Sequence, residues 1–307
     1  STASILYLPQ PPLQEPFTLK WLTQIVAALQ SRGESLDLIL GHLPQPGNDR
    51  ERVLRKRLHQ WMDQNLLKLF LSDSGSAPTL CLSSQNERDQ IALQLQVDEH
   101  NRPTEWFKVT TQRGVTTVYD RLHQLKQKAR PIPFQELLDQ ETIVIFPDPA
   151  DPAWRGLSID MLRQRLALTP ILTGHTLQRV MYRDRYLQAE GARILAALLQ
   201  GDWFQPNTQV TIHTRQSYEE DRRNDTSRRN AIATAMNKHL GIKPTIEFCL
   251  FRDRYHQHMP HQRELLLHRQ DQQVYRVLFD RGLDFIHNNQ PRGYDIKELT
   301  YVVVTKH

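Results

Sequence analysis

Two stretches near the end of the chain set its architecture: HQRELLLHR at residues 261–269 and VYRVLFDRGLDFI at residues 274–286. Each contains a run of apolar residues of strand length, bounded by polar or turn-forming residues. Such runs predict two β-strands in succession. Charged or ionisable side chains flank both apolar runs: His261 and Arg263 precede the first run, and Arg281 follows the second run. The ends of these strands are therefore the first place to look for a binding site.

The region from residue 169 onward alternates between strand and helix patterns. Further strands are predicted at TLQRVMYRDRYL, TQVTIHTR, PTIEFCLFR and TYVVVT, and helices at QAEGARILAALLQG and SYEEDRRNDTSRRNAIATAMNKHLG. Helices that alternate with strands and are followed by strands in succession favour a mixed sheet flanked by helices. We therefore predict an α/β domain over residues 169–307, in a chain that is α+β overall.

The first part of the chain shows a different order of elements. The segments FTLKWLTQIVAALQSRG, SLDLILGHL and DRERVLRKRLHQWMDQN predict three helices, with Gly33 as a C-cap of the first. The following LLKLFLSDSGSAPTLCLS contains two apolar runs around a Ser/Gly/Pro turn and predicts a pair of strands. This order resembles that of a winged helix, so residues 1–83 are predicted to be a winged-helix-like domain.

The third helix of a winged helix contacts DNA, and the corresponding helix here is rich in basic residues: Arg50, Arg52, Arg55, Lys56 and Arg57. Arg50 and Arg57 are one heptad apart, so a helix would allow both to meet neighbouring phosphates. Acidic residues such as Glu51 dilute the positive charge. The alternative interpretation is an ordinary solvated helix face.

Residues 84–168 are predicted to form a small α/β connector, with a second degenerate winged unit as the alternative. EWFKVTTQRG and GVTTVYDRL predict a strand and a helix, and ETIVIF predicts a buried strand. The proline-rich PDPADPAWRG then predicts a loop, and SIDMLRQRLAL predicts a helix that leads into the third domain.

Composition indicates a globular chain of 307 residues, 39% of them hydrophobic, with a net charge of +5. This mild basic excess is compatible with a phosphate-rich partner but does not require one. Cys81 and Cys249 are far apart in apolar surroundings, which suits a reducing compartment. No apolar run approaches the length of a membrane span and no leader pattern is present, so a cytoplasmic location is expected.

Three short motifs lie between the predicted strands of residues 169–307. They are Asp184-Arg185-Tyr186, His261-Gln262-Arg263-Glu264 and Arg281-Gly282-Leu283-Asp284. With these motifs in this order, the region from about residue 175 onward resembles the phospholipase D-like fold. The resemblance is to its non-catalytic, single-copy version, which forms the C-terminal domain of microtubule-interacting-and-trafficking proteins and also occurs in bacterial gene clusters.

Catalytic members of this superfamily carry a His-x-Lys-x4-Asp motif twice, within one chain or across a dimer. The resemblance implies that one histidine attacks phosphorus while the other protonates the leaving oxygen, so both copies must share a pocket. Here Arg263 replaces the lysine and His268 replaces the aspartate, and no second His-x-Lys is present. An arginine preserves phosphate binding. We therefore predict no catalytic residues, with a dimeric phosphodiesterase around His261 and Arg263 as the enzymatic alternative.

The resemblance also implies an anion pocket, whose members would be Asp184, Tyr186, His261, Arg263 and Arg281. They would converge near the carboxyl ends of strands, where open α/β sheets bind ligands. The alternative is a buried polar network that only holds the sheet edges.

The helix after the second strand supplies another candidate for nucleic-acid binding: Arg222, Arg223, Arg228 and Arg229. These pairs are spaced to straddle a groove. Acids at the start of the helix and bases beyond it also suit the helix dipole without any ligand.

These features predict a non-enzymatic accessory protein that binds nucleic acid, DNA rather than RNA, or docks onto protein partners of a larger complex. A prokaryotic defence or mobile-element setting follows only from the family resemblance. No cofactor and no metal site are predicted, because phosphate-binding loops and zinc spacings are absent from the sequence. A metal-independent nuclease and a scaffold for proteins or acidic membranes are the alternatives, and homodimerisation is left open.

Overall fold

The computed structural model describes residues 4–10, 17–73, 77–82, 91–98, 103–139, 141–216, 223–249, 263–297 and 301–307. The chain divides into two compact units, Ser1–Asp139 and Gln140–His307. This single boundary replaces the two boundaries expected near residues 83 and 168. Both units are mixed α/β structures, which confirms the predicted fold class. Among the described helices, none combines the length and apolar character that a membrane crossing requires.

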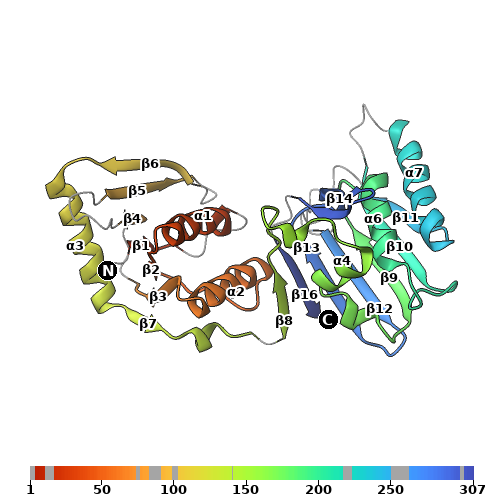
Figure 1. Cartoon of the computed structure of the whole chain (residues 1–307), viewed down its shortest axis with the longest axis horizontal. Helices are drawn as coiled ribbons and strands as arrows, with labels where there is room; N and C mark the ends of the chain where they lie inside the picture. Colours follow the sequence, from red (N-terminus) through yellow and green to blue (C-terminus); the bar gives the residue numbers. More distant parts are fainter. Residues whose placement is uncertain are drawn as a thin grey trace. The chain divides into compact units, whose positions relative to one another are not determined.

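The first unit is built on a seven-stranded mixed sheet with the order β6-β5-β4-β1-β2-β3-β7 (Figure 1). Its strands are β1 (Ser4–Leu8), β2 (Leu36–Leu40), β3 (Leu67–Leu71), β4 (Thr79–Leu82), β5 (Ile91–Val97), β6 (Pro103–Val109) and β7 (Arg130–Ile132). Its helices are α1 (Phe17–Ser31), α2 (Asp49–Asp63) and α3 (Gln112–Lys128). The strands β1, β2 and β3 are parallel, and α1 and α2 connect them.

The winged-helix expectation for residues 17–83 is wrong, because SLDLILGHL does not form a helix. Leu36–Leu40 instead form the central parallel strand β2, and all five residues are buried. A short, mostly apolar run such as LDLIL does not distinguish a strand from a buried helix. Pairing on both edges and burial on both faces select the strand here. The predicted two-stranded ribbon is also absent, because β3 pairs with β2 and β7 whereas β4 pairs with β1 and β5.

The expected connector over residues 84–168 is divided between the two units. Its strand β6 and helix α3 were predicted correctly, but with β5 and β7 they complete the first unit. The predicted strand ETIVIF is β8 (Thr142–Ile145), and it pairs within the sheet of the second unit. Sequence periodicity identified these elements but not the sheet to which each belongs.

Helix α3 packs on one face of the first sheet, where Val115 and Leu122 meet a core that includes Ile5, Tyr7 and Cys81. The same face contains a charged pair. Lys126 Nζ lies 2.8 Å from Asp37 Oδ2, and the Asp37 side chain is only 5% exposed. The pair links α3 to the central strand β2, and the lysine offsets part of the cost of burying the Asp37 carboxylate.

We predict that Lys126→Met destabilises the first unit by about 3 kcal/mol, because it leaves the buried Asp37 carboxylate without its cation. Hydrogen exchange of β2 and α3 amides measures the change. The double variant Asp37→Leu/Lys126→Met should recover most of the loss, and Lys128→Met, at an exposed position of the same helix, is the control. Equal protection in Lys126→Met and Lys128→Met would contradict the assignment.

The second unit is built on another seven-stranded mixed sheet, with the order β11-β10-β9-β12-β13-β16-β8. Besides β8, its strands are β9 (Leu177–Arg183), β10 (Gln209–Arg215), β11 (Thr245–Cys249), β12 (Arg263–Arg269), β13 (Val274–Phe279) and β16 (Val302–Lys306). Its helices are α4 (Ile159–Arg165), α5 (Thr169–Leu172), α6 (Ala189–Leu199) and α7 (Arg223–Leu240). A separate hairpin joins β14 (Ile286–Asn289) to β15 (Gly293–Ile296).

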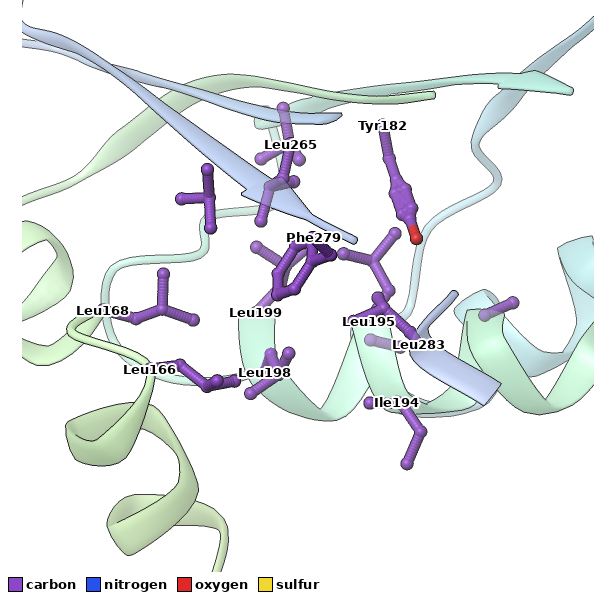
Figure 2. Close-up of a cluster of buried hydrophobic side chains, with 14 of the residues drawn as sticks. Leu166, Leu168, Tyr182, Ile194, Leu195, Leu198, Leu199, Leu265, Phe279 and Leu283 are labelled. Atoms are coloured by element: carbon purple, nitrogen blue, oxygen red, sulfur yellow. The ribbon is translucent and has the colours of Figure 1, made fainter. Parts of the chain in front are cut away.

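The core of the second unit lies between its sheet and helix α6. Figure 2 shows Leu195, Leu198 and Leu199 of α6 in the same cluster as Leu265 of β12 and Phe279 of β13. These side chains are at most 1% exposed. The alternating burial of β9, β10 and β12 follows the strand period of two and leaves their other residues on the opposite face.

The two units share one topology. In each, three parallel strands are joined by two helices, and three antiparallel strands follow on the side of the first parallel strand. The six strands β1 to β6 therefore correspond in order to β9, β10, β11, β12, β13 and β16. Each unit adds one strand of its own, β7 beside β3 in the first and β8 beside β16 in the second.

Candidate anion-binding site

Polar residues from several strands gather at one edge of the second sheet, and this edge is formed by the ends of the strands. The strands β9 and β10 are parallel, β12 is antiparallel to β9, and β13 is antiparallel to β12. The carboxyl ends of β9, β10 and β13 therefore meet the amino end of β12 at the same edge. The residues at these four positions are Asp184 with its neighbours, Arg215, Asp280 with its neighbours, and Arg263.

Asp184 is the centre of this edge. Its side chain is buried, since the residue is only 3% exposed. The hydroxyl of Tyr182 donates to Asp184 Oδ2 at 3.1 Å, and the backbone N–H of Tyr186 donates to Oδ1 at 2.9 Å. Arg263 Nε lies 3.6 Å from the same Oδ1. A single carboxylate thus connects the core tyrosine of β9, the turn after β9 and the first residue of β12.

Burial raises the pKa of Asp184, because the charged form loses its hydration. The Tyr186 N–H, Arg263 and Tyr182 lower that pKa again, and the nearby Asp284 carboxylate raises it, but burial dominates. Burial also raises the pKa of Tyr182 well above its usual value, so its hydroxyl stays protonated and able to donate. The fold therefore buries the Asp184 carboxyl group in a place that disfavours its ionised form.

Four arginines lie at this edge, and we call them the arginine cluster: Arg185, Arg215, Arg228 and Arg263. Arg228 and Arg263 are close to Asp184, and Arg215 and Arg263 are close to Arg185. Arg185 is 5% exposed, and its pKa is lowered first by burial and then by the charge of Arg215. The backbone carbonyl of Arg185 accepts from the Arg215 N–H at 3.3 Å, which fixes the ends of β9 and β10 to each other. Arginine remains cationic in spite of such shifts, so the cluster concentrates positive charge.

Helix α7 contributes Arg228 to the arginine cluster. Its guanidinium donates to the backbone carbonyl of Arg215 and lies 4.9 Å from the Phe248 ring centroid. Burial lowers the pKa of Arg228, while Asp225 and Asp184 raise it. The Nε of Arg228 is buried and makes no hydrogen bond within the described part of the chain. A buried donor without an acceptor is uncommon in folded proteins.

Gly282 allows the chain after β13 to approach the site closely. A Cβ at this position would lie 2.2 Å from Asp284 Oδ1 and 3.4 Å from Asp184 Oδ2. A side chain at this position would therefore displace the Asp284 carboxylate, and glycine lets the Arg-Gly-Leu-Asp motif keep a second carboxylate beside Asp184. The cluster then has four guanidinium groups against three nearby carboxylates, those of Asp184, Asp225 and Asp284, an excess of one positive charge.

The structure brings together three of the five residues expected in the anion pocket. Asp184, Tyr186 and Arg263 lie close together, and the Arg263 guanidinium lies 5.9 Å from the Tyr186 ring centroid. Arg281 is at the same edge of the sheet but packs over Phe285, at 5.8 Å from its ring centroid. His261 lies outside the described residues.

The structure describes the side chains of two of the four arginines expected on the charged helix, Arg228 and Arg229. Arg228 belongs to the arginine cluster, and Arg229 donates to the Ile246 carbonyl at 2.9 Å while stacking on Phe248. Arg222 lies outside the described residues, and the side chain of Arg223 is likewise outside the description. Tertiary contacts with β10 and β11 thus decide where this helix directs its described arginines.

The described arginines of α2 make hydrogen bonds within the first unit. Arg52 donates to the Pro46 carbonyl at 2.8 Å, and Arg55 donates to the Pro44 carbonyl at 2.9 Å and to the Glu136 carbonyl. Arg57 donates to Gln60 at 2.7 Å and stacks on Trp61. Lys56 is half-buried, and the side chain of Arg50 lies outside the description. The described arginines of α2 mainly anchor neighbouring loops and their own helix.

Sequence reasoning missed Arg185 and Arg215 as members of the site. Arg185 stands inside the Asp-x-Tyr motif, and Arg215 is the last residue of the next parallel strand. The rule that ligands bind at the carboxyl ends of parallel strands would have pointed to both. What no local pattern shows is that Arg228 reaches the same point from a helix.

Comparisons with known proteins give one family match. Residues 158–301 match the family described as the C-terminal domain of the DEAD/DEAH box helicase YjiV. The matched segment is less than half of the chain, and it contains Asp184 and all four residues of the arginine cluster.

No curated protein matches the chain. Among solved structures, the phosphatidylserine synthase of Haemophilus influenzae Rd KW20 is similar at 10% sequence identity, with a TM-score of 0.28. The similarity covers 99% of this chain and 77% of that chain. A TM-score this low does not define a shared fold.

We predict that Asp184→Asn stabilises the chain relative to the wild type as the pH rises from about 4 to 7. The raised pKa of Asp184 means that the folded chain binds this proton more tightly than the unfolded chain does. That contribution is present at low pH and is lost as the pH rises through the raised pKa, whereas asparagine stays neutral throughout. Urea unfolding of both proteins across this range measures the difference.

Asp202→Asn is the control for this experiment, because Asp202 is exposed after helix α6. Its difference from the wild type should not follow the same pH dependence. If the Asp184→Asn variant instead loses stability relative to the wild type as the pH rises, the ion pair with Arg263 outweighs burial.

Proposed function

We propose that this protein is a non-enzymatic accessory module that binds nucleic-acid phosphates through the arginine cluster. The observation that carries the proposal is the convergence of Arg185, Arg215, Arg228 and Arg263 on one edge of the second sheet. Guanidinium groups bind phosphate oxygens with charge-assisted and often bidentate hydrogen bonds. Such contacts position a nucleic acid without reading its sequence.

The family match supports a nucleic-acid-related role. The matched family is described as a domain of a DEAD/DEAH box helicase, and the matched residues include the whole candidate site. A helicase acts on nucleic acid, so an accessory phosphate-binding domain is consistent with that description. We assign nucleic acid and proteins of the same assembly as partners, and the defence or mobile-element setting stays a prediction.

Tyr186 adds a second element to the proposed site. It is 53% exposed, next to Arg263 and hydrogen-bonded to the Arg185 side chain. An exposed aromatic ring beside phosphate-binding arginines provides a surface on which an unpaired base stacks. This arrangement favours a single strand or a strand end over a continuous duplex, because bases inside a duplex are already stacked.

The repeated topology supports a binding role over cleavage. A phospholipase D-like mechanism needs two copies of its motif in one pocket, and the first unit is the second copy of the topology in this chain. The carboxyl end of its β1 leads to Pro9, where the second unit has Asp184. Ala77 and Pro78 precede its β4, where the second unit has the His-x-Arg segment. These residues supply neither a nucleophile nor a phosphate-binding cation.

We predict that Arg215→Gln/Arg263→Gln weakens binding to single-stranded oligonucleotides at least about tenfold and lowers the salt slope by about 1–2, because two phosphate contacts are lost. Fluorescence anisotropy over a range of salt concentrations measures both quantities. DNA and RNA, single strands and duplexes, are compared in the same assay.

The matched control is Lys56→Gln/Arg57→Gln, which removes the same charge from helix α2 of the first unit. Its binding should stay within about twofold of the wild type, since these residues lie outside the proposed site. Loss of binding in the α2 variant, with retention in the cluster variant, would move the interface to α2 and contradict the proposal.

Incubation of labelled oligonucleotides with the protein in a chelator tests the non-enzymatic part separately. The substrates should remain intact, because one pocket lacks the paired groups of the superfamily mechanism. Cleavage that disappears in His261→Ala would overturn this part and favour a nuclease assembled from two chains.

A further inference from the structure

The strand β6 forms one edge of the first sheet, and no described strand pairs with its outer side. Its central side chains, from Thr104 to Lys108, are all exposed. They include two large apolar groups, because Trp106 is 36% exposed and Phe107 is 46% exposed. An exposed aromatic edge strand presents unpaired backbone groups beside an apolar surface, and proteins normally cover or disrupt such edges.

The second unit shows how the same topological position is covered. Its counterpart of β6 is β16, and β16 pairs on its outer side with β8, in antiparallel orientation. The register sets Val302 opposite Ile145, Val303 opposite Val144 and Val304 opposite Ile143. One copy of this topology therefore accepts an additional antiparallel strand at the edge where the other copy has none among the described residues.

The two faces of β6 define the chemistry of a strand that would fit beside it. Trp106 points to the side of α1, where its ring meets Trp21 at a centroid distance of 6.2 Å. Phe107 is the next residue and so points to the opposite face, the side of α3. A strand paired with β6 extends both apolar faces only if it has apolar residues at consecutive positions. The run Thr142-Ile143-Val144-Ile145 of β8 has this property.

A second copy of the chain fits this edge poorly. In a two-fold antiparallel pairing of β6 with itself, opposite side chains share a face, so only residues of the same parity are opposite each other. Glu105 would then face Phe107, Val109 or another Glu105. Each of these arrangements places a carboxylate against an apolar side chain or a like charge.

We infer that β6 is a docking edge for an extended strand of a partner protein, which pairs antiparallel and contributes consecutive β-branched apolar residues. Backbone hydrogen bonds supply affinity in this mode of recognition, and the side chains on the two faces supply specificity. The site is separate from the arginine cluster and does not depend on the function proposed for it.

The test uses the full chain and a labelled peptide with the sequence of residues 140–147, QETIVIFP, carrying a lysine tail for solubility. Binding is followed by fluorescence anisotropy, and hydrogen exchange locates the contact. We expect protection of β6 amides when the peptide is bound. The same peptide with N-methyl groups at the positions of Ile143 and Val144 keeps its side chains but blocks both of its edges, so its binding should be lost.

Phe107→Glu should weaken peptide binding at least about tenfold, because it places a charge on one face of the docking edge. Leu138→Glu is the matched control, since Leu138 is also 46% exposed and lies outside β6. Two results would overturn the inference: equal binding of the N-methylated peptide, and protection that appears on β16 or elsewhere instead of on β6. Protection of β6 by self-association without peptide would overturn the choice of partner. The peptide comparison and the exchange pattern use wild-type protein, so they decide the matter even if Phe107→Glu folds poorly.

Discussion

The arrangement of the second unit depends on one constraint, which is that helices cover its parallel strands. The helix-facing residues of β9 and β10, such as Val180 and Ile212, are almost fully buried, so ionisable groups on that side are confined to the strand ends. The carboxyl ends of parallel strands lie at one edge. Asp184 and Arg215 therefore meet there although 31 positions separate them in the sequence, and the antiparallel β12 delivers Arg263 to the same place. The polar site is a consequence of the way the apolar core is assembled.

The buried carboxylate of Asp184 links the stability of the second unit to the arrangement of the arginine cluster. It orders the Tyr186 turn through a backbone hydrogen bond and holds the Arg263 guanidinium within 3.6 Å. Burying the charge is unfavourable, as the raised pKa of Asp184 indicates, and the surrounding donors offset only part of that cost. An anion that binds the arginines would compete with Asp184 for Arg263. The site thus has its arginines positioned before any ligand arrives.

The two units share one topology but differ in the residues at the carboxyl ends of their parallel strands. In the first unit the carboxyl ends of β1 and β2 are in direct backbone contact: the Gly41 N–H donates to the Leu8 carbonyl at 2.8 Å. A Cβ on Gly41 would lie 2.1 Å from the Pro9 carbonyl oxygen, so only glycine fits. The first unit thus has no room for a side chain at Gly41, whereas the corresponding strand ends of the second unit carry Arg185 and Arg215. Function belongs to the residues placed on the fold and not to the fold alone.

The sequence by itself determined most elements of the second unit and the motif residues Asp184, Tyr186 and Arg263. Strand and helix periods are local properties, and strand ends can be read wherever apolar runs are clearly bounded. Only the tertiary structure decided that LDLIL is a strand, because its four apolar residues around Asp37 do not select a strand over a buried helix, and the pairing of β2 with β1 and β3 is non-local. It also decided that ETIVIF joins the second sheet and that Arg228 reaches Asp184 from α7. Pairing partners and the convergence of distant side chains depend on contacts across the whole chain, which no local pattern encodes.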